Sequence, residues 1–161
     1  MLTYEWDLEF DGVTFDPEIK GEQPTVTFAD NFAPRTIALR VTDSHGKSDI
    51  ATTTLEVTNV SPAVDAGPDQ TVDEGSKVTL NGTFIDPGTA DTHSFLWQVS
   101  ARNGQVVADG KAQNFSFTPA DNGVYIVTFS VTDDDGTSAS DQVAVTVNNA
   151  PPIAAGCLDR F

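Results

Sequence analysis

The chain has 161 residues and a formal net charge of −16, from 24 acidic and 8 basic side chains. Its hydrophobic fraction of 39% and aromatic fraction of 9% are typical of folded domains rather than of disorder. Nucleic acid and a bare anionic membrane surface are excluded as favoured partners, because this charge would be repelled by both. No apolar stretch approaches the roughly eighteen residues of a membrane span, so we expect no direct membrane insertion.

The N-terminal residues predict a β-strand that is entered in mid-course. Tyr4, Trp6 and Leu8 alternate with polar residues, as in a strand with one buried face. No signal peptide precedes this strand. We therefore interpret the chain as a fragment of a longer protein.

An acidic segment follows this strand and resembles the first half of a calcium loop. Its acidic residues stand at every second position: Asp7, Glu9 and Asp11. Counted from the first of them, Gly12 occupies position six and Glu18 position twelve, as such loops require. Pro17 would stop the helix that normally follows, so a helix–loop–helix hand is rejected. A calcium-binding loop in a β-domain remains a hypothesis.

Self-similarity with a period of about ninety residues organises the whole chain. Residues 41–48 return as residues 131–138, and residues 55–59 match residues 145–149 at the same offset. We predict a first copy at 1–59 that lacks its opening strands and a complete second copy at 60–149. Residues 150–161 are the start of a third copy or a disordered tail.

The second copy predicts short strands separated by turns. Apolar residues alternate with polar ones in the runs 78–84, 95–99, 115–117, 125–131 and 143–147. Asp-Gly and Asn-Gly pairs lie between most of these runs, and no segment has a sustained helical period. The predicted fold class is therefore all-β, a β-sandwich.

Two features indicate an immunoglobulin-like sandwich. Trp97 lies in the middle of its run, where such folds bury a tryptophan between the sheets. Residues 121–127 resemble the tyrosine corner, with Val127 at the position of the second cysteine of antibody domains. Cys157 is the single cysteine, so a disulfide framework is excluded.

The motifs resemble those of the PKD (polycystic kidney disease-type) domain in its bacterial and archaeal surface-protein form. They are Tyr-Glu-Trp-Asp at 4–7, Ala-Gly-Pro-Asp-Gln-Thr-Val-Asp-Glu-Gly at 66–75 and Gly-Val-Tyr-Ile-Val-Thr-Phe-Ser-Val-Thr-Asp at 123–133. The first copy departs from the pattern with Arg35 in place of the corner tyrosine, and the second with Gln98 after its tryptophan. The resemblance implies an extracellular or cell-surface location.

The same resemblance implies calcium between carboxylates after the tryptophan, in the linker and at the strand end. In the first copy these positions are Asp7, Glu9 and Asp43, and in the second they are Asn59, Asp133 and Asp134. The alternative is that aspartate, asparagine and glycine only make turns and keep the surface soluble.

Residues for catalysis are scarce, and we predict that the protein is not an enzyme. Asp43 and Ser44 flank His45, but sequence neighbours on one turn rarely take up triad geometry. His93 is expected in a loop.

The resemblance favours a spacer or adhesion module that contacts an extracellular protein or polysaccharide and neighbouring repeats of the same chain. The alternative is an accessory substrate-binding module of a secreted protease or polysaccharide hydrolase. That role needs exposed aromatic residues in a row, for which the first copy offers Phe10, Phe15 and Phe32.

Overall fold

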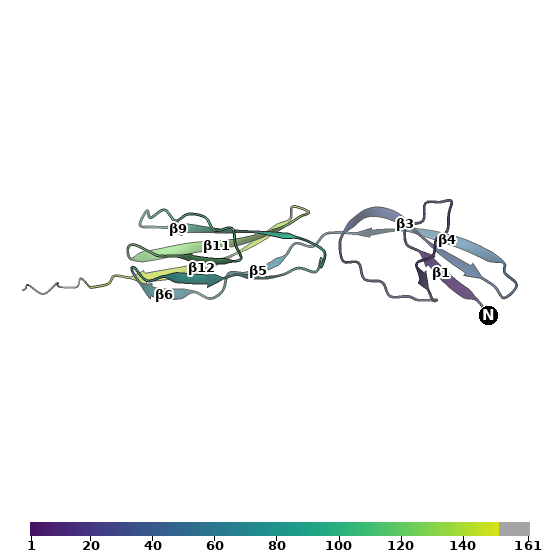
Figure 1. Cartoon of the computed structure of the whole chain (residues 1–161), viewed down its shortest axis with the longest axis horizontal. Helices are drawn as coiled ribbons and strands as arrows, with labels where there is room; N and C mark the ends of the chain where they lie inside the picture. Colours follow the sequence, from purple (N-terminus) through teal and green to yellow (C-terminus); the bar gives the residue numbers. More distant parts are fainter. Residues whose placement is uncertain (152–161) are drawn as a thin grey trace, which may run out of the picture. The chain divides into compact units, whose positions relative to one another are not determined.

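The computed structural model describes residues 1–151, so the predicted third copy at 150–161 lies almost wholly outside the described residues. The elements described are all β-strands (Figure 1). The described residues divide into two compact units, Met1–Val60 with Pro87–Asp91, and Ser61–Asp86 with residues 92–151. No helix in residues 1–151 has the length and hydropathy of a membrane span.

The first unit is built on one antiparallel sheet in the order β2-β1-β3-β4. Its strands are β1 (Thr3–Asp7), β2 (Ile19–Lys20), β3 (Phe32–Thr42) and β4 (Ser48–Val57). Trp6 of β1 lies opposite Ile19 on one side and Leu39 on the other, and Leu39 lies opposite Ala51 of β4. The strands β3 and β4 form a long hairpin around Gly46, whose φ of +81° suits glycine.

The second unit has a main sheet in the order β6-β12-β11-β9 and two further strand pairs, β10-β7 and β5-β8 (Figure 1). The bounds are β5 (Ala63–Asp65), β6 (Gln70–Asp73), β7 (Val78–Asn81), β8 (Thr83–Ile85), β9 (His93–Ala101), β10 (Asn114–Phe117), β11 (Gly123–Asp133) and β12 (Ser138–Asn148). Only β6 against β12 is parallel among the described pairs. The predicted immunoglobulin-like sandwich is confirmed. The predicted run 78–84 is interrupted at Gly82, which separates β7 from β8.

Equivalent residues of the two units pair in the same way within their own sheets. Trp97 of β9 lies opposite Phe129, which lies opposite Asp141 of β12. These three positions correspond to Trp6, Leu39 and Ala51 of the first unit. An isolated bridge joins Trp97 to Gly110, as Trp6 is joined to Ile19.

Alternate side chains along the strands fill the core of the second unit. Every second residue of β11 from Tyr125 to Val131 is fully buried. The ring of Trp97, also fully buried, stacks on Phe129 at a centroid distance of 4.3 Å and on Phe115 at 5.8 Å. The predicted burial of the tryptophan is confirmed.

The predicted tyrosine corner is also confirmed. The buried Tyr125 hydroxyl lies 2.9 Å from the carbonyl oxygen of Asp121 and 2.8 Å from Gln105 Oε1, and it accepts a hydrogen bond of 2.7 Å from Asn103 Nδ2. In the first unit, Arg35 takes the equivalent place. Its guanidinium lies over the ring of Phe32, 3.7 Å from the centroid, and pairs with Glu9.

The first unit has far less core. Ala38 is its one fully buried hydrophobic residue within the described part of the chain. Val26 and Phe28 have the same spacing as the strand residues Phe115 and Phe117 of the second unit, yet residues 24–28 belong to no strand. The physical reason is that β10 forms only by pairing with β7, and the first unit has no counterpart of β7 in the described residues.

Candidate functional site

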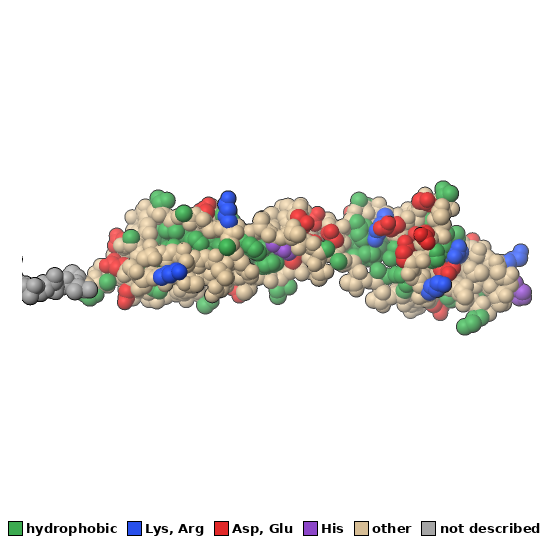
Figure 2. All heavy atoms as spheres, in the orientation of Figure 1, with side chains coloured by type: hydrophobic (Ala, Val, Ile, Leu, Met, Phe, Trp, Pro, Cys, Tyr) green, Lys and Arg blue, Asp and Glu red, His purple; other side chains and the backbone are tan. Residues whose placement is uncertain are grey.

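The acidic segment after β1 encloses a hollow on the first unit. Its volume is about 400 Å³, and the side chains that line it are mostly carboxylates: Asp7, Glu9, Asp11, Thr14, Asp16 and Glu18. Figure 2 shows acidic side chains gathered on this unit beside apolar ones. The structure thus brings Asp7, Glu9, Asp11 and Glu18 together, the positions that the calcium-loop pattern singled out.

Asp7 is the structural centre of this hollow. It is 3% exposed, at the end of β1. Its Oδ1 accepts a 3.0 Å hydrogen bond from the backbone N–H of Glu9, and its Oδ2 accepts one of 2.9 Å from Asp16. A buried carboxylate costs free energy unless such donors compensate it. The two bonds tie both ends of the loop to the sheet.

The other carboxylates of the hollow also bind backbone amides or a cation. Asp11 Oδ1 accepts hydrogen bonds from Thr14 and Val13, and these bonds hold the pKa of Asp11 below its usual value. Glu18 Oε2 accepts a 2.8 Å bond from the backbone N–H of Leu8, while Glu9 pairs with Arg35. These hydrogen bonds and the ion pair with Arg35 therefore hold the loop in place.

The oxygen ligands suit calcium in kind but are not gathered as a calcium site requires. Oxygens on one Ca²⁺ lie within about 5 Å of one another, because each bond is about 2.3–2.6 Å long. Among the described residues, no three carboxylates of this hollow meet that spacing. Loading the site would require Glu9 to leave Arg35 and the exposed side chains to turn inward.

Asp43 does not join Asp7 and Glu9. Thr3 lies opposite Thr42 and Asp7 opposite Ala38, so Asp43 is at the other end of β1, more than about 12 Å along the strand. Asp43 instead caps the β3–β4 hairpin, where its Oδ1 accepts hydrogen bonds from the backbone N–H groups of His45 (2.8 Å) and Lys47 (2.9 Å).

Asp133 caps the β11–β12 hairpin in the same way, through the backbone N–H and the hydroxyl of Thr137. Asp134 Oδ1 accepts a 3.1 Å bond from the backbone N–H of Thr92. Asn59 follows β4 in the first unit, whereas Asp133 and Asp134 belong to the second. The turn-making alternative describes the hydrogen bonds of Asp43 and Asp133 well.

Asp43, Ser44 and His45 do not take up the geometry of a hydrolytic triad. The exposed Ser44 Oγ lies 3.5 Å from His45 Nδ1, but the Asp43 carboxylate bonds backbone amides rather than orienting that ring. Triad geometry needs the acid on the imidazole itself.

Sequence reasoning missed a buried pair in the second unit. His93 was expected in a loop, yet it is the first residue of β9, and its Nε2 lies 2.9 Å from Asp86 Oδ2. The two side chains are only 11% and 3% exposed, and the His93 ring lies 4.6 Å from that of Phe84. The expectation was wrong because the inward alternation of Phe95, Trp97 and Val99 extends back to position 93, a signal that the sequence carries.

Comparisons with known proteins agree with this architecture. The family model described as "K319L-like, PKD domain" matches residues 66–147. A curated mouse relative, "Dyslexia-associated protein KIAA0319 homolog", is 27% identical over 99% of this chain, and the chain spans 16% of its length.

Solved structures with a similar fold include other β-sandwich modules. The PKD domain of the KIAA 1837 protein is 21% identical, with a TM-score of 0.39, over 62% of this chain and 99% of that one. The fibronectin(III)-like modules of Clostridium thermocellum CbhA are 15% identical, with a TM-score of 0.41, over 56% of this chain and 99% of that one.

Proposed function

The chain belongs to the K319L-like PKD domain family, and from this premise we propose that it is a non-catalytic extracellular spacer and adhesion module. The observation that carries the proposal is how the second unit uses its polar residues. Its buried polar side chains serve the fold: Asp133 caps a hairpin, and Tyr125 closes the corner. His93 pairs with Asp86, and the His93 ring lies against that of Phe84.

The spacer role predicts a defined length. Only residues 58–62 lie between β4 and β5, and Pro62 restricts the backbone of this short linker. Small-angle scattering of a chain with several such units would give one maximum dimension that grows by a constant increment per unit. A broad, freely jointed distribution of dimensions would contradict the spacer role.

An accessory substrate-binding role is less favoured. Such modules need a platform of exposed aromatic rings, and none of the large exposed hydrophobic residues in the described part is aromatic. Phe15 lies under the guanidinium of Arg40 at 4.2 Å, and Phe28 packs on Phe32 at 5.1 Å. Retention of the chain on chitin, cellulose or collagen at near-physiological salt would favour the accessory role over the spacer role.

Calcium binding in the hollow of the first unit is a further part of the proposal. Its support is that five carboxylates, which supply hard oxygen ligands, line one hollow, and its cost is the loss of the ion pair between Glu9 and Arg35. We expect millimolar calcium, but not magnesium, to raise the Tm of the first unit.

The matched variants for this test are Asp11→Asn, which removes a carboxylate of the hollow, and Asp49→Asn, which removes one from the exposed strand β4. The first variant should abolish the calcium shift and the second should retain it. An unchanged Tm in the unsubstituted protein, or equal loss in both variants, would contradict the metal site and leave the spacer role intact.

A further inference from the structure

The outer face of the main sheet of the second unit carries no charge on strands β9, β11 and β12. In these strands the odd-numbered residues face the core, as the full burial of Trp97, Val127 and Val143 shows. The even-numbered residues face outward and are exposed or half-buried. Charged residues make up 20% of the chain, yet none stands at these outward positions, which run from Ser94 to Ser100, from Val124 to Thr132 and from Ser138 to Asn148.

Short or amide side chains that both donate and accept hydrogen bonds dominate this face. At its centre, Gln98 lies opposite Thr128, which lies opposite Gln142. Thr128 Oγ1 accepts a 3.1 Å hydrogen bond from Gln142 Nε2. Short side chains lose less rotamer freedom in a contact than the long charged side chains of an ordinary surface. Ordering this face against a partner therefore costs little free energy.

Charged side chains stand at the margin of the face. On the β6 edge, Asp73 accepts a 3.2 Å hydrogen bond from Asn148 Nδ2. Beside β9, Asp109 accepts one of 3.4 Å from Gln98 Nε2. An uncharged centre with a polar, charged margin is the pattern that separates the core of a protein interface from its rim.

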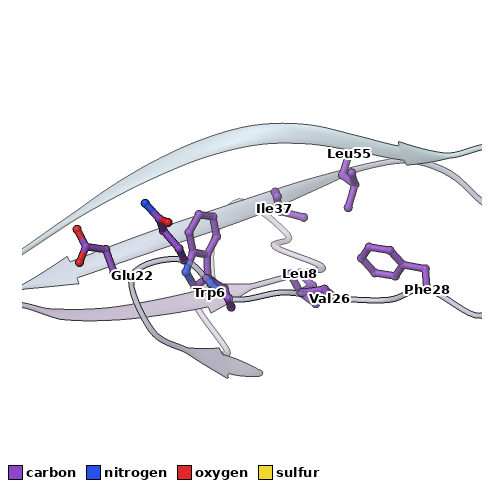
Figure 3. A pocket seen from close by; sticks show the side chains of 9 residues that line it. Trp6, Leu8, Glu22, Val26, Phe28, Ile37 and Leu55 are labelled. Carbon is purple, nitrogen blue, oxygen red and sulfur yellow. The ribbon is translucent and has the colours of Figure 1, made fainter.

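The corresponding face of the first unit is charged. Figure 3 shows Trp6 and Ile37 on the inner face of that sheet, where they line a pocket. On the opposite face, Glu5 forms ion pairs with Lys20 at 3.4 Å and with Arg40 at 2.6 Å. In the second unit, uncharged residues occupy the places of Glu5 and Arg40 in the sheet register. The absence of charge is therefore particular to the second unit and is no general property of strands in this chain.

This face is the outside of a complete sandwich. The second unit contains the main sheet and the strand pairs β10-β7 and β5-β8, and its core is filled from the inner side of the main sheet. The exposure of the outer face follows from no missing strand. Whatever binds there comes from outside the unit.

We propose that this face binds the same face of a second copy of the chain. Each copy has a net charge of −16, so two copies repel least where neither presents a charged side chain. Serine, threonine and glutamine each donate and accept hydrogen bonds, so two identical faces can satisfy one another about a two-fold axis.

Other occupants fit the face less well. A basic partner would be drawn to the acidic surfaces of the chain instead. A polysaccharide would find no aromatic ring among the outward residues of β9, β11 and β12 on which to stack. The composition therefore favours an uncharged protein face, and the face itself meets that requirement.

The size of the face predicts a weak and reversible dimer. From Val124 to Thr132 the strand rises about 27 Å, and four neighbouring strands span about 19 Å, so the contact covers roughly 500 Å² per copy. This area is at the low end for specific interfaces. Weak contacts suit adhesion, because several repeats bind together. The inference deepens the adhesion part of the proposed function and rests on it, whereas the spacer role is tested separately by scattering.

The experiment is sedimentation equilibrium of the full chain, with amide NMR spectra at the same concentrations. We expect monomer at about 10 μM and dimer at about 1 mM, because the contact is small. Amide shifts on dilution should be confined to β9, β11, β12 and their margin. Added salt should strengthen the association, since it screens the net charge while no ion pair holds the centre of the face.

Two variants with the same change in charge form a matched pair. Thr128→Glu places a carboxylate at the centre of the face, and Thr79→Glu places one on an exposed residue of β7, in the other layer. The first should weaken dimerisation at least tenfold, and the second less than twofold. The dilution shifts of the unsubstituted protein keep the test valid even where a variant disturbs folding.

The proposal is overturned by a chain that stays monomeric over this range, by dilution shifts that lie elsewhere, or by equal weakening in both variants. Association that salt weakens would also overturn it, because ion pairs would then hold the dimer. A monomeric chain whose β9, β11 and β12 amides shift on addition of cellohexaose would assign the face to a polysaccharide and overturn it as well. None of these results affects the spacer role.

Discussion

Removing one hydroxyl group should measure the tyrosine corner of the second unit. Tyr125→Phe deletes an oxygen that lies within 2.9 Å of Asp121 O and Gln105 Oε1 and that accepts a bond from Asn103 Nδ2. The ring itself is fully buried and stays in place, so packing against Phe117 at 5.7 Å is retained. The substitution therefore isolates the hydrogen bonds.

The magnitude follows from what the three partners keep. Asn103 Nδ2 also donates to the carbonyl oxygens of Asp121 and Asn122, at 3.3 and 3.2 Å. Gln105 Oε1 still accepts a 2.8 Å bond from the backbone N–H of Ala120. No partner is left wholly unsatisfied, so the loss should be about 1–2 kcal/mol, the lower part of the range for buried hydrogen bonds.

The assay is urea unfolding of the full chain, with hydrogen exchange at the amides of β11 to assign the change to the second unit. The urea midpoint should fall with an unchanged m value. In thermal unfolding, the Tm of a domain of this size should fall by about 5–10 °C. Tyr4→Phe is the matched control, because Tyr4 is the chain's other tyrosine and lies half-buried in the first unit. A change below about 0.5 kcal/mol in Tyr125→Phe, or an equal change in both variants, would refute the corner as a stabilising element.

Two further predictions test packing and charge. In Gly82→Ala, the new Cβ would lie 2.6 Å from Cδ1 of the fully buried Phe129. The free energy of unfolding, measured in urea, should therefore fall by about 1–3 kcal/mol. Adding Phe129→Leu to this variant should restore part of the loss. The hydrogen bonds of Arg40 to Glu5 hold the pKa of Glu5 below its usual 4.5, so the pair adds stability above that pH and loses it as the pH falls through the lower folded value. Urea midpoints of the first unit should therefore fall more steeply with acid in the unsubstituted protein than in Arg40→Gln, and parallel profiles would contradict the assignment.

Local alternation was enough to predict most of the second unit. The period of two in residues 95–99, 125–131 and 143–147 located β9, β11 and β12, because a strand with one buried face leaves that pattern whatever its partners are. Trp97 and Tyr125 were assigned to the core and the corner because their positions resemble those of the buried tryptophan and the corner tyrosine of immunoglobulin-like folds. These are properties of one strand at a time.

The sequence could not predict which strands pair or which acidic side chains lie together, because both depend on neighbours in space. Val26 and Phe28 carry a strand pattern, yet a strand exists only with a hydrogen-bonded partner. Asp7 ends β1 and Asp43 follows β3, yet the antiparallel register of these two strands places the two aspartates at opposite ends of β1. Alternation did predict that Asp7, Glu9 and Asp11 lie near one another, but not that backbone amides and Arg35 would engage them.

The difference between the two units shows how much of the core depends on a strand that covers the sheet. Trp6, Ile37 and Leu55 match Trp97, Val127 and Val145 in sheet register, and only the second set is fully buried. Apolar area left in water stabilises nothing, whereas the same area covered by a strand contributes in proportion to its extent. The burial of Trp97, Val127 and Val145 therefore contributes stability that the half-buried Trp6, Ile37 and Leu55 contribute only in part.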